Sequence, residues 1–194
     1  MVATYVLHGG GTSKDSADND EFFKRFTSIV HKNEIKILMC YFARPLEKWE
    51  ELLKRDEAKI RKNTDKKVEL IVTKDAGDLL NKLKISDVLY VAGGEQEHLA
   101  PYYSKLSELE MALSGKVYIG SSMGAFMVSR NYVLSLSRQE ENKVFKGIDI
   151  LPISTLCHWN VEKKKAYKIQ ILKDADNQAP IVTLDEGKFA VFVK

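Results

Sequence analysis

The feature of this sequence best suited to chemistry is a Gly-x-Ser-x-Gly segment that runs from Gly120 to Gly124. An apolar run precedes it and helix-compatible residues follow it, which is the strand–turn–helix setting that presents a nucleophilic serine. Small residues on either side of such a turn let the strand and the helix approach closely. The pattern predicts Ser122 as the nucleophile, because the rival hydroxyl of Ser121 occupies a variable position. The alternative is an ordinary Gly/Ser turn.

Two further glycine-rich segments follow expected strands. Gly93 and Gly94 end an apolar run and lead into a helix. Their backbone N–H groups, with that of Met123, could stabilise an oxyanion. The alternative interpretation is that the two glycines only form a tight strand-to-helix turn. The HGGGT segment at 8–12 resembles the oxyanion motif of esterases and lacks the ending of a Walker phosphate loop. We expect it to form a flexible edge of the pocket and assign it no site role.

A serine nucleophile needs a general base, and the chain has only four histidines. His31 lies near the end of an amphipathic segment, which favours a surface role. His8 ends an expected strand inside a glycine loop, and His98 begins a helix. His158 follows the apolar run LPISTLC, which would bring it to a strand end. We therefore predict His158 as the base, the alternative being a hydrogen-bonded core histidine.

The acid that would orient this base has several candidates after the nucleophile. Glu140 and Glu141 lie in a polar stretch typical of a solvated loop, and Asp149 is a further carboxylate. Asp185 and Glu186 end an apolar run and precede a glycine. A carboxylate at the end of a buried strand is well placed to orient an imidazole. Either of these last two residues fits.

Short apolar runs alternate with amphipathic segments along the chain. Apolar runs typical of buried strands occupy residues 3–9, 35–43, 67–73, 87–94, 116–122 and 179–184. Helices are expected at residues 18–32, 45–63, 75–84 and 97–115. This alternation predicts a mostly parallel sheet with helices on both faces, and ligands bind such sheets at the carboxyl ends of their strands.

Composition narrows the class of protein. The 194 residues suffice for one domain, 1–194, and the net charge of +3 is too small and too dispersed for a nucleic-acid-binding stripe. Two cysteines, Cys40 and Cys157, lie in apolar runs and are expected to be buried thiols. The absence of metal-binding spacings predicts no metal or other cofactor. The lack of a signal peptide or spanning segment favours a cytoplasmic protein that contacts no membrane.

Four segments taken in order resemble the dipeptidase E (aspartyl dipeptidase) and cyanophycinase family of serine peptidases. They are YVAGGEQEHL, YIGSSMGAF, GIDILPISTLCHW and VTLDEGKFAVFV. The resemblance covers most of the chain. It implies an α/β three-layer sandwich with a mostly parallel sheet, similar to class I glutamine amidotransferases.

The same resemblance implies roles for individual residues. Ser122 would be the nucleophile, His158 the base and Glu186 the acid of a Ser-His-Glu triad. Gly94 and Met123 would supply the oxyanion-hole N–H groups. In this order the acid follows the histidine, whereas in α/β-hydrolases it precedes the histidine.

The sequence also departs from the family pattern. The family's Gly-Gly-Asn-Thr loop is Gly93-Gly94-Glu95-Gln96 here, and Met123 replaces the usual alanine after the serine. We expect Gly93, Glu95 and Gln96 to contact substrate, and acidic side chains in this loop to disfavour an anionic substrate side chain.

These observations predict a hydrolase that cleaves short peptides through an acyl-enzyme on Ser122. An esterase-like hydrolase with the same triad and a non-catalytic binding protein on the same fold are the alternatives. The expected partner is a short peptide, not nucleic acid or membrane. For assembly, a homodimer is the default expectation because C2 dimers are the commonest oligomers.

Overall fold

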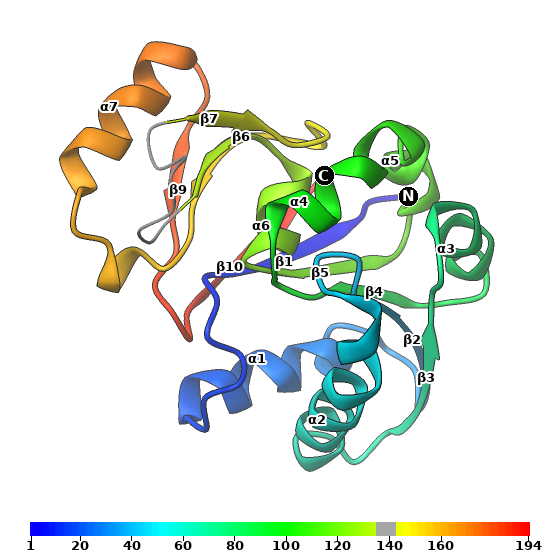
Figure 1. Cartoon of the computed structure of the whole chain (residues 1–194). Coiled ribbons are helices and arrows are strands. Elements are labelled where there is room, and N and C mark those ends of the chain that lie inside the picture. The colour runs from blue at the N-terminus through cyan, green and yellow to red at the C-terminus, as the bar shows by residue number, and fades with distance from the viewer. Residues whose placement is uncertain (135–142) are drawn as a thin grey trace.

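The computed structural model describes residues 1–134 and 143–194, and a six-stranded sheet forms its centre (Figure 1). The strand order is β10-β1-β5-β4-β2-β3, and β10 alone runs antiparallel to its neighbour. These strands are β1 (Thr4–His8), β2 (Glu34–Cys40), β3 (Lys67–Val72), β4 (Val88–Val91), β5 (Val117–Ser121) and β10 (Phe189–Val193). The predicted mostly parallel sheet is therefore confirmed.

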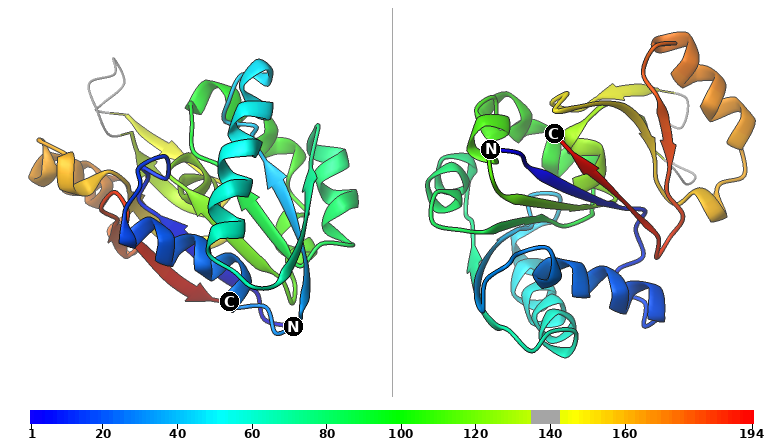
Figure 2. Two further views of the ribbon diagram at one scale, coloured as in Figure 1. Left: turned by 90° about the horizontal axis from the view of Figure 1, so that it is seen from below. Right: turned by 180° about the vertical axis from the view of Figure 1, so that it is seen from behind.

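Helices cover both faces of this sheet (Figures 1 and 2). One face carries α1 (Ala17–Ser28), the short η1 (Leu46–Lys48) and α2 (Trp49–Lys62). The other carries α3 (Ala76–Leu83), α4 (Gln96–Leu99), η2 (Ala100–Lys105), α5 (Leu109–Ala112) and α6 (Met123–Val128). Each helix layer buries its own apolar cluster against the sheet, so the expected three-layer α/β sandwich is present.

A second sheet of four strands lies beside the first, in the order β7-β6-β8-β9. Its elements are β6 (Ser129–Val133), β7 (Val144–Lys146), β8 (Leu151–Leu156) and β9 (Ile181–Thr183), with η3 (Trp159–Val161) and α7 (Lys165–Ala175) between β8 and β9. The apolar run at 179–184 thus forms part of the second sheet. Hydrophobic pattern alone identifies a strand but not the sheet it joins.

The single helix expected over 97–115 is instead three short pieces, α4, η2 and α5. Pro101 stands at the start of η2. Proline lacks the N–H group of a regular helical hydrogen bond and restricts the preceding residue, which explains the interruption.

Strand register brings the glycine-rich segments to one edge of the central sheet. His8 at the end of β1 lies opposite Ser121 at the end of β5, and Val91 at the end of β4 lies opposite Gly120. The three loops that follow these strands therefore emerge side by side at the carboxyl edge. Within residues 1–134 and 143–194, none of the helices has the length and apolar character needed to cross a membrane.

Candidate active site

Ser122 occupies a strained turn between β5 and α6. Its backbone angles are φ 49° and ψ −106°, a region that non-glycine residues rarely adopt. The Ser122 N–H donates to the carbonyl of His8 (2.9 Å), and the Ser122 carbonyl accepts from Phe126 N–H (3.0 Å). Such strain costs on the order of 1–3 kcal/mol and persists only where the surroundings enforce it. Here the enforced conformation is that of a nucleophile elbow.

The two motif glycines are required because backbone packs against them. A Cβ added to Gly120 would lie 2.5 Å from the carbonyl of Gly124, and a Cβ added to Gly124 would lie 2.2 Å from the carbonyl oxygen of Val91. Side chains at either position would push α6 away from β5 and β4. The sequence-based explanation of the motif, close approach of strand and helix, is what the structure shows.

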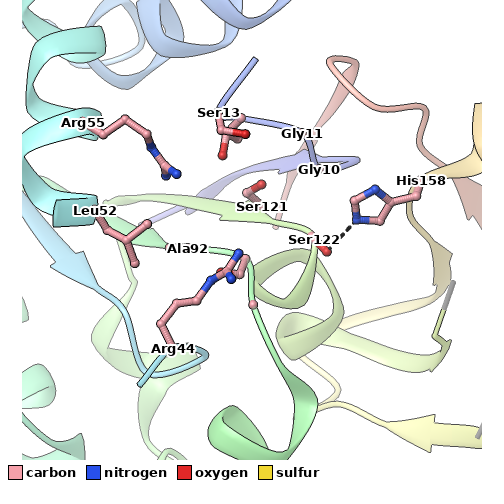
Figure 3. Close-up of a pocket in the computed structure, with 13 residues that line it drawn as sticks. Gly10, Gly11, Ser13, Arg44, Leu52, Arg55, Ala92, Ser121, Ser122 and His158 are labelled. Atoms are coloured by element: carbon pink, nitrogen blue, oxygen red, sulfur yellow. Dashed lines mark hydrogen bonds between the residues drawn. The ribbon is translucent and has the colours of Figure 1, made fainter. Parts of the chain in front are cut away.

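Ser122, His158 and Glu186 form a continuous hydrogen-bonded chain. Ser122 Oγ lies 3.1 Å from His158 Nε2, and His158 Nδ1 lies 2.7 Å from Glu186 Oε1 (Figure 3 shows the first contact). Because the carboxylate can only accept, Nδ1 carries the proton and Nε2 is left to accept from the serine hydroxyl. This tautomer is the one a general base needs.

Two loops from the second sheet deliver the base and the acid. His158 follows β8, adopts φ 54°, and its backbone N–H donates to the Gly9 carbonyl (2.9 Å). Glu186 lies in the turn after β9, where its N–H donates to Asn160 Oδ1 (2.9 Å). The Lys14 ammonium bonded to Glu186, together with His158, lowers the pKa of this carboxyl, although partial burial opposes the shift.

Among the described carboxylates considered for the acid, Glu186 is the one that contacts the His158 imidazole. Asp185 contacts Gly9 through its main-chain carbonyl, whereas Glu186 reaches the imidazole. Asp149 pairs with Arg130. The candidates at 140 and 141 lie outside the described residues.

The other histidines considered as bases lie elsewhere. His8 is fully buried, and burial lowers its pKa to about 4. Its Nδ1 accepts from Gly10 N–H (3.1 Å), so its Nε2 donates to Asn19 Oδ1 (3.1 Å). His98, on α4, is not among the residues that line the active-site cavity.

The Gly-Gly loop after β4 lies directly beside the nucleophile. A Cβ on Gly93 would meet the Ser122 Cβ at 3.1 Å, and Gly94 packs against the carbonyl of Ala43. Gly93 and Gly94 both line the cavity in front of Ser122, whereas Glu95 and Gln96 are not among its lining residues.

The glycine loop after β1 is built into the site rather than standing at its margin. A Cβ on Gly10 would lie 2.3 Å from the His158 ring, and one on Gly11 would contact the Glu186 side chain at 3.4 Å. Gly10, Gly11, Thr12 and Ser13 also line the cavity. The loop therefore backs both the base and the acid, a role that the resemblance of HGGGT to an esterase motif did not predict.

The cavity beside Ser122 has a volume of about 150 Å³, and two arginines line it. Its lining includes Arg44 and Arg55 and no carboxylate, and both guanidinium groups extend toward Ser121 and Ser122 (Figure 3). The acidic character expected from the Gly-Gly-Glu-Gln loop does not describe this cavity, because the glutamate of that loop lies outside the lining.

Neither arginine was identified from the sequence as a site residue. Arg44 follows β2 at the carboxyl edge of the sheet, a position that the strand-end rule could have flagged. Its Nε donates to the Gly93 carbonyl (2.7 Å). Arg55 lies on α2, where no sequence signal marks it, and it bonds the buried Asp56 through Nε (2.9 Å) and a terminal nitrogen (2.6 Å).

No cluster of three or more His, Cys, Asp or Glu side chains suited to a metal ion occurs in the part of the chain that the structure describes. Cys40 and Cys157 are buried free thiols, as the sequence predicted.

Comparison with known proteins identifies a family and a curated relative of this chain. The model of peptidase family S51 matches residues 5–194. An uncharacterized peptidase of Listeria monocytogenes is 26% identical over 133 residues, which make up 64% of this chain and 64% of that protein. The match thus spans somewhat under two thirds of the curated relative's length.

Solved structures share the fold. A Listeria monocytogenes protein assigned as peptidase E superposes with a TM-score of 0.63 at 19% identity, covering 100% of this chain and 98% of that one. A peptidase from an acI-B1 Actinobacterium gives a TM-score of 0.63 at 17% identity, covering 100% and 84% of the two chains. At these identities the likeness establishes the fold.

Proposed function

The chain belongs to peptidase family S51, and from that membership we propose that it is a serine peptidase that cleaves short peptides through an acyl-enzyme on Ser122. The family assignment confirms the relationship that the sequence segments suggested. The observation that carries the proposal is the hydrogen-bonded chain from Ser122 through His158 to Glu186. A non-catalytic binding protein would have no need to hold a serine in a strained turn against a correctly protonated imidazole.

In the proposed reaction His158 Nε2 takes the Ser122 proton as Oγ attacks the substrate carbonyl. The resulting imidazolium is stabilised by Glu186, whose lowered pKa keeps it ionised at neutral pH. His158 then returns the proton to the leaving amine, and water attacks the acyl-enzyme by the same route in reverse. Each step moves one proton through one imidazole nitrogen.

Backbone N–H groups are proposed to hold the tetrahedral oxyanion. Met123 is the first residue of α6, and the first N–H groups of a helix have no acceptor within the helix. Gly94 lines the same cavity as Ser122, in a loop anchored by the Arg44 bond to Gly93. We propose that these two N–H groups together form the oxyanion hole.

The cavity supports a preference for an acidic residue on the acyl side of the cleaved bond. Its volume of about 150 Å³ suits one modest side chain. Arg44, whose Nε bonds the Gly93 carbonyl, supplies further guanidinium donors, and guanidinium groups bind carboxylates through charge-assisted hydrogen bonds. Arg55 lines the same cavity but is already paired with Asp56. We propose a peptide whose residue before the cleaved bond carries a carboxylate.

Covalent labelling tests the nucleophile. A fluorophosphonate should label the wild type at Ser122, located by peptide mapping, and should label Ser121→Ala equally. Ser122→Ala should remain unlabelled. Labelling that maps to Ser121, or that survives in Ser122→Ala, would reject the assignment.

Matched substrates test the pocket. We expect wild type to prefer an Asp-containing dipeptide over the same dipeptide with Asn, and Arg44→Met to reduce that ratio of kcat/KM roughly 10- to 100-fold, as for loss of a charged hydrogen bond. Both substrates are measured with the same variant, so a general loss of activity lowers both kcat/KM values and leaves their ratio unchanged. The same Asp-to-Asn ratio in wild type and Arg44→Met would show that Arg44 does not recognise the substrate carboxylate.

A panel of aryl esters tests the esterase alternative. Faster turnover of aryl esters than of any peptide would favour that alternative.

A further inference from the structure

The glycine loop at residues 9–14 ends in Lys14, and we propose that Lys14 is a positioning residue for Glu186, the acid of the triad. The inference rests on the proposed function, since Glu186 has a catalytic part only if His158 acts as the base. The proposal gives a role to the glycine loop, whose sequence resembles an oxyanion motif. In the structure this loop lies against the base and the acid.

The two carboxylate oxygens of Glu186 are divided between two partners. Oε1 accepts from His158 Nδ1 at 2.7 Å, and Oε2 accepts from the Lys14 ammonium. The Glu186 side chain is only 14% exposed. Because each oxygen has its own donor, rotation of the carboxylate would break at least one bond. Lys14 therefore opposes the rotation that would take Oε1 away from the imidazole.

An exposed lysine usually contributes little, because ordering its side chain offsets the gain from the ion pair. The Lys14 side chain is 66% exposed, but its backbone is fixed. Its carbonyl accepts from Asn19 Nδ2 (2.7 Å) and from Lys59 Nζ (3.1 Å), and its N–H donates to the Gly11 carbonyl (3.0 Å). The ammonium thus extends from a fixed point toward a fixed carboxylate.

The same loop is tied to the buried interior and to the base. Asn19 Nδ2 also donates to the Gly11 carbonyl (2.9 Å), and Asn19 Oδ1 accepts from the neutral His8 ring. His8 in turn accepts from Gly10 N–H, and Gly10 packs against the His158 imidazole. The loop that presents Lys14 to the acid is therefore also the loop that packs against the base.

The position of Lys14 also has an electrostatic consequence. Its positive charge offsets part of the Glu186 charge that stabilises the His158 imidazolium. The other charged or titratable groups around the pair include Lys59, which contacts the Lys14 carbonyl and pairs with Asp15. They also include His8, the Lys188–Asp18 ion pair, and Arg44 and Arg55 in the cavity lining. Removing the Lys14 side chain should loosen the Glu186 carboxylate, because Oε2 would lose its donor.

The test compares Lys14→Met with Lys188→Met. Lys188 is similarly exposed (60%) and pairs with Asp18 instead of Glu186, so it controls for the loss of one positive charge nearby. In substrate-free protein, the NMR resonance of the His158 Nδ1–H proton reports the hydrogen bond to Glu186 directly. This resonance should broaden or move upfield in Lys14→Met, because the carboxylate is no longer held in one orientation. Lys188→Met should leave the resonance as in the wild type, and Lys14→Arg should restore it.

Turnover provides the second measurement. With an Asp-containing dipeptide, kcat should fall roughly 3- to 10-fold in Lys14→Met with KM nearly unchanged, because the acid and not the substrate is affected. Wild-type values of both kcat and the Nδ1–H resonance in Lys14→Met would overturn the proposal, as would equal changes in Lys188→Met. If the wild type cleaves no peptide but Lys14→Met still changes the resonance, the proposed peptidase function fails and the contact of Lys14 with Glu186 stands.

Discussion

Acidification should destabilise this protein through His8. This ring is fully buried and neutral, and its pKa falls from 6.5 to about 4 because burial disfavours the charged form. As the pH falls below 6.5 the unfolded chain takes up a proton that the folded chain refuses. Stability present above pH 6.5 is therefore lost progressively as the pH falls toward 4. Between pH 7 and pH 5 this single group should cost about 2 kcal/mol.

Urea unfolding at pH 7 and pH 5 measures this loss, using wild type, His8→Gln and His31→Gln. Glutamine retains one acceptor for Gly10 N–H and one donor for Asn19, but it does not titrate. The change in unfolding free energy between the two pH values should be smaller by about 2 kcal/mol in His8→Gln, equivalent to roughly 1 M urea in the midpoint. His31, at the protein surface near the end of α1, serves as the matched control and should leave the wild-type dependence intact. If the unfolding free energy falls as much between pH 7 and pH 5 in His8→Gln as in wild type, His8 is not buried in its neutral form.

Two further substitutions test the elbow and the acid. Gly124→Ala should lower the free energy of unfolding by roughly 1–3 kcal/mol, because its Cβ would lie 2.2 Å from the Val91 carbonyl oxygen. Gly77→Ala in α3 is the control, because its Cβ would meet nothing closer than 3.4 Å, and it should be neutral or stabilising. If chemical denaturation gives the same loss of unfolding free energy for both variants, the packing argument is wrong. Glu186→Gln should reduce kcat by a factor on the order of 10²–10⁴ through loss of the required imidazole tautomer, whereas Asp185→Asn should stay close to wild type. The reverse ranking in steady-state kinetics would assign the acid to Asp185.

Local features of the site could be predicted from the sequence because local chemistry dictates them. The elbow needs Gly120, Ser122 and Gly124 within five positions, and the strand before it and helix after it are continuous in the chain. His158 could be predicted because an apolar strand delivers it. These features depend on short-range sterics and periodicity, which a single sequence displays.

Features that depend on contacts between distant segments could not be predicted. Lys14 and Glu186 are 172 positions apart and meet only through the pairing of β1 with β10 and the turn after β9. Arg55 enters the cavity from α2, and helical periodicity does not say which cavity a polar face borders. Pro101 lies within the helix expected over 97–115 and interrupts it, because proline cannot donate the backbone hydrogen bond of a regular helix.

Turnover of a mixed dipeptide and tripeptide library, followed by mass spectrometry for wild type and Ser122→Ala together, tests the central claim most directly. The variant retains the fold-forming glycines and loses only the hydroxyl that His158 contacts at 3.1 Å. We predict that wild type cleaves a subset of short peptides, enriched in those with an acidic residue before the cleaved bond, and that Ser122→Ala cleaves none. Cleavage of the same peptides by Ser122→Ala, or no cleavage by wild type, would contradict the proposed serine peptidase.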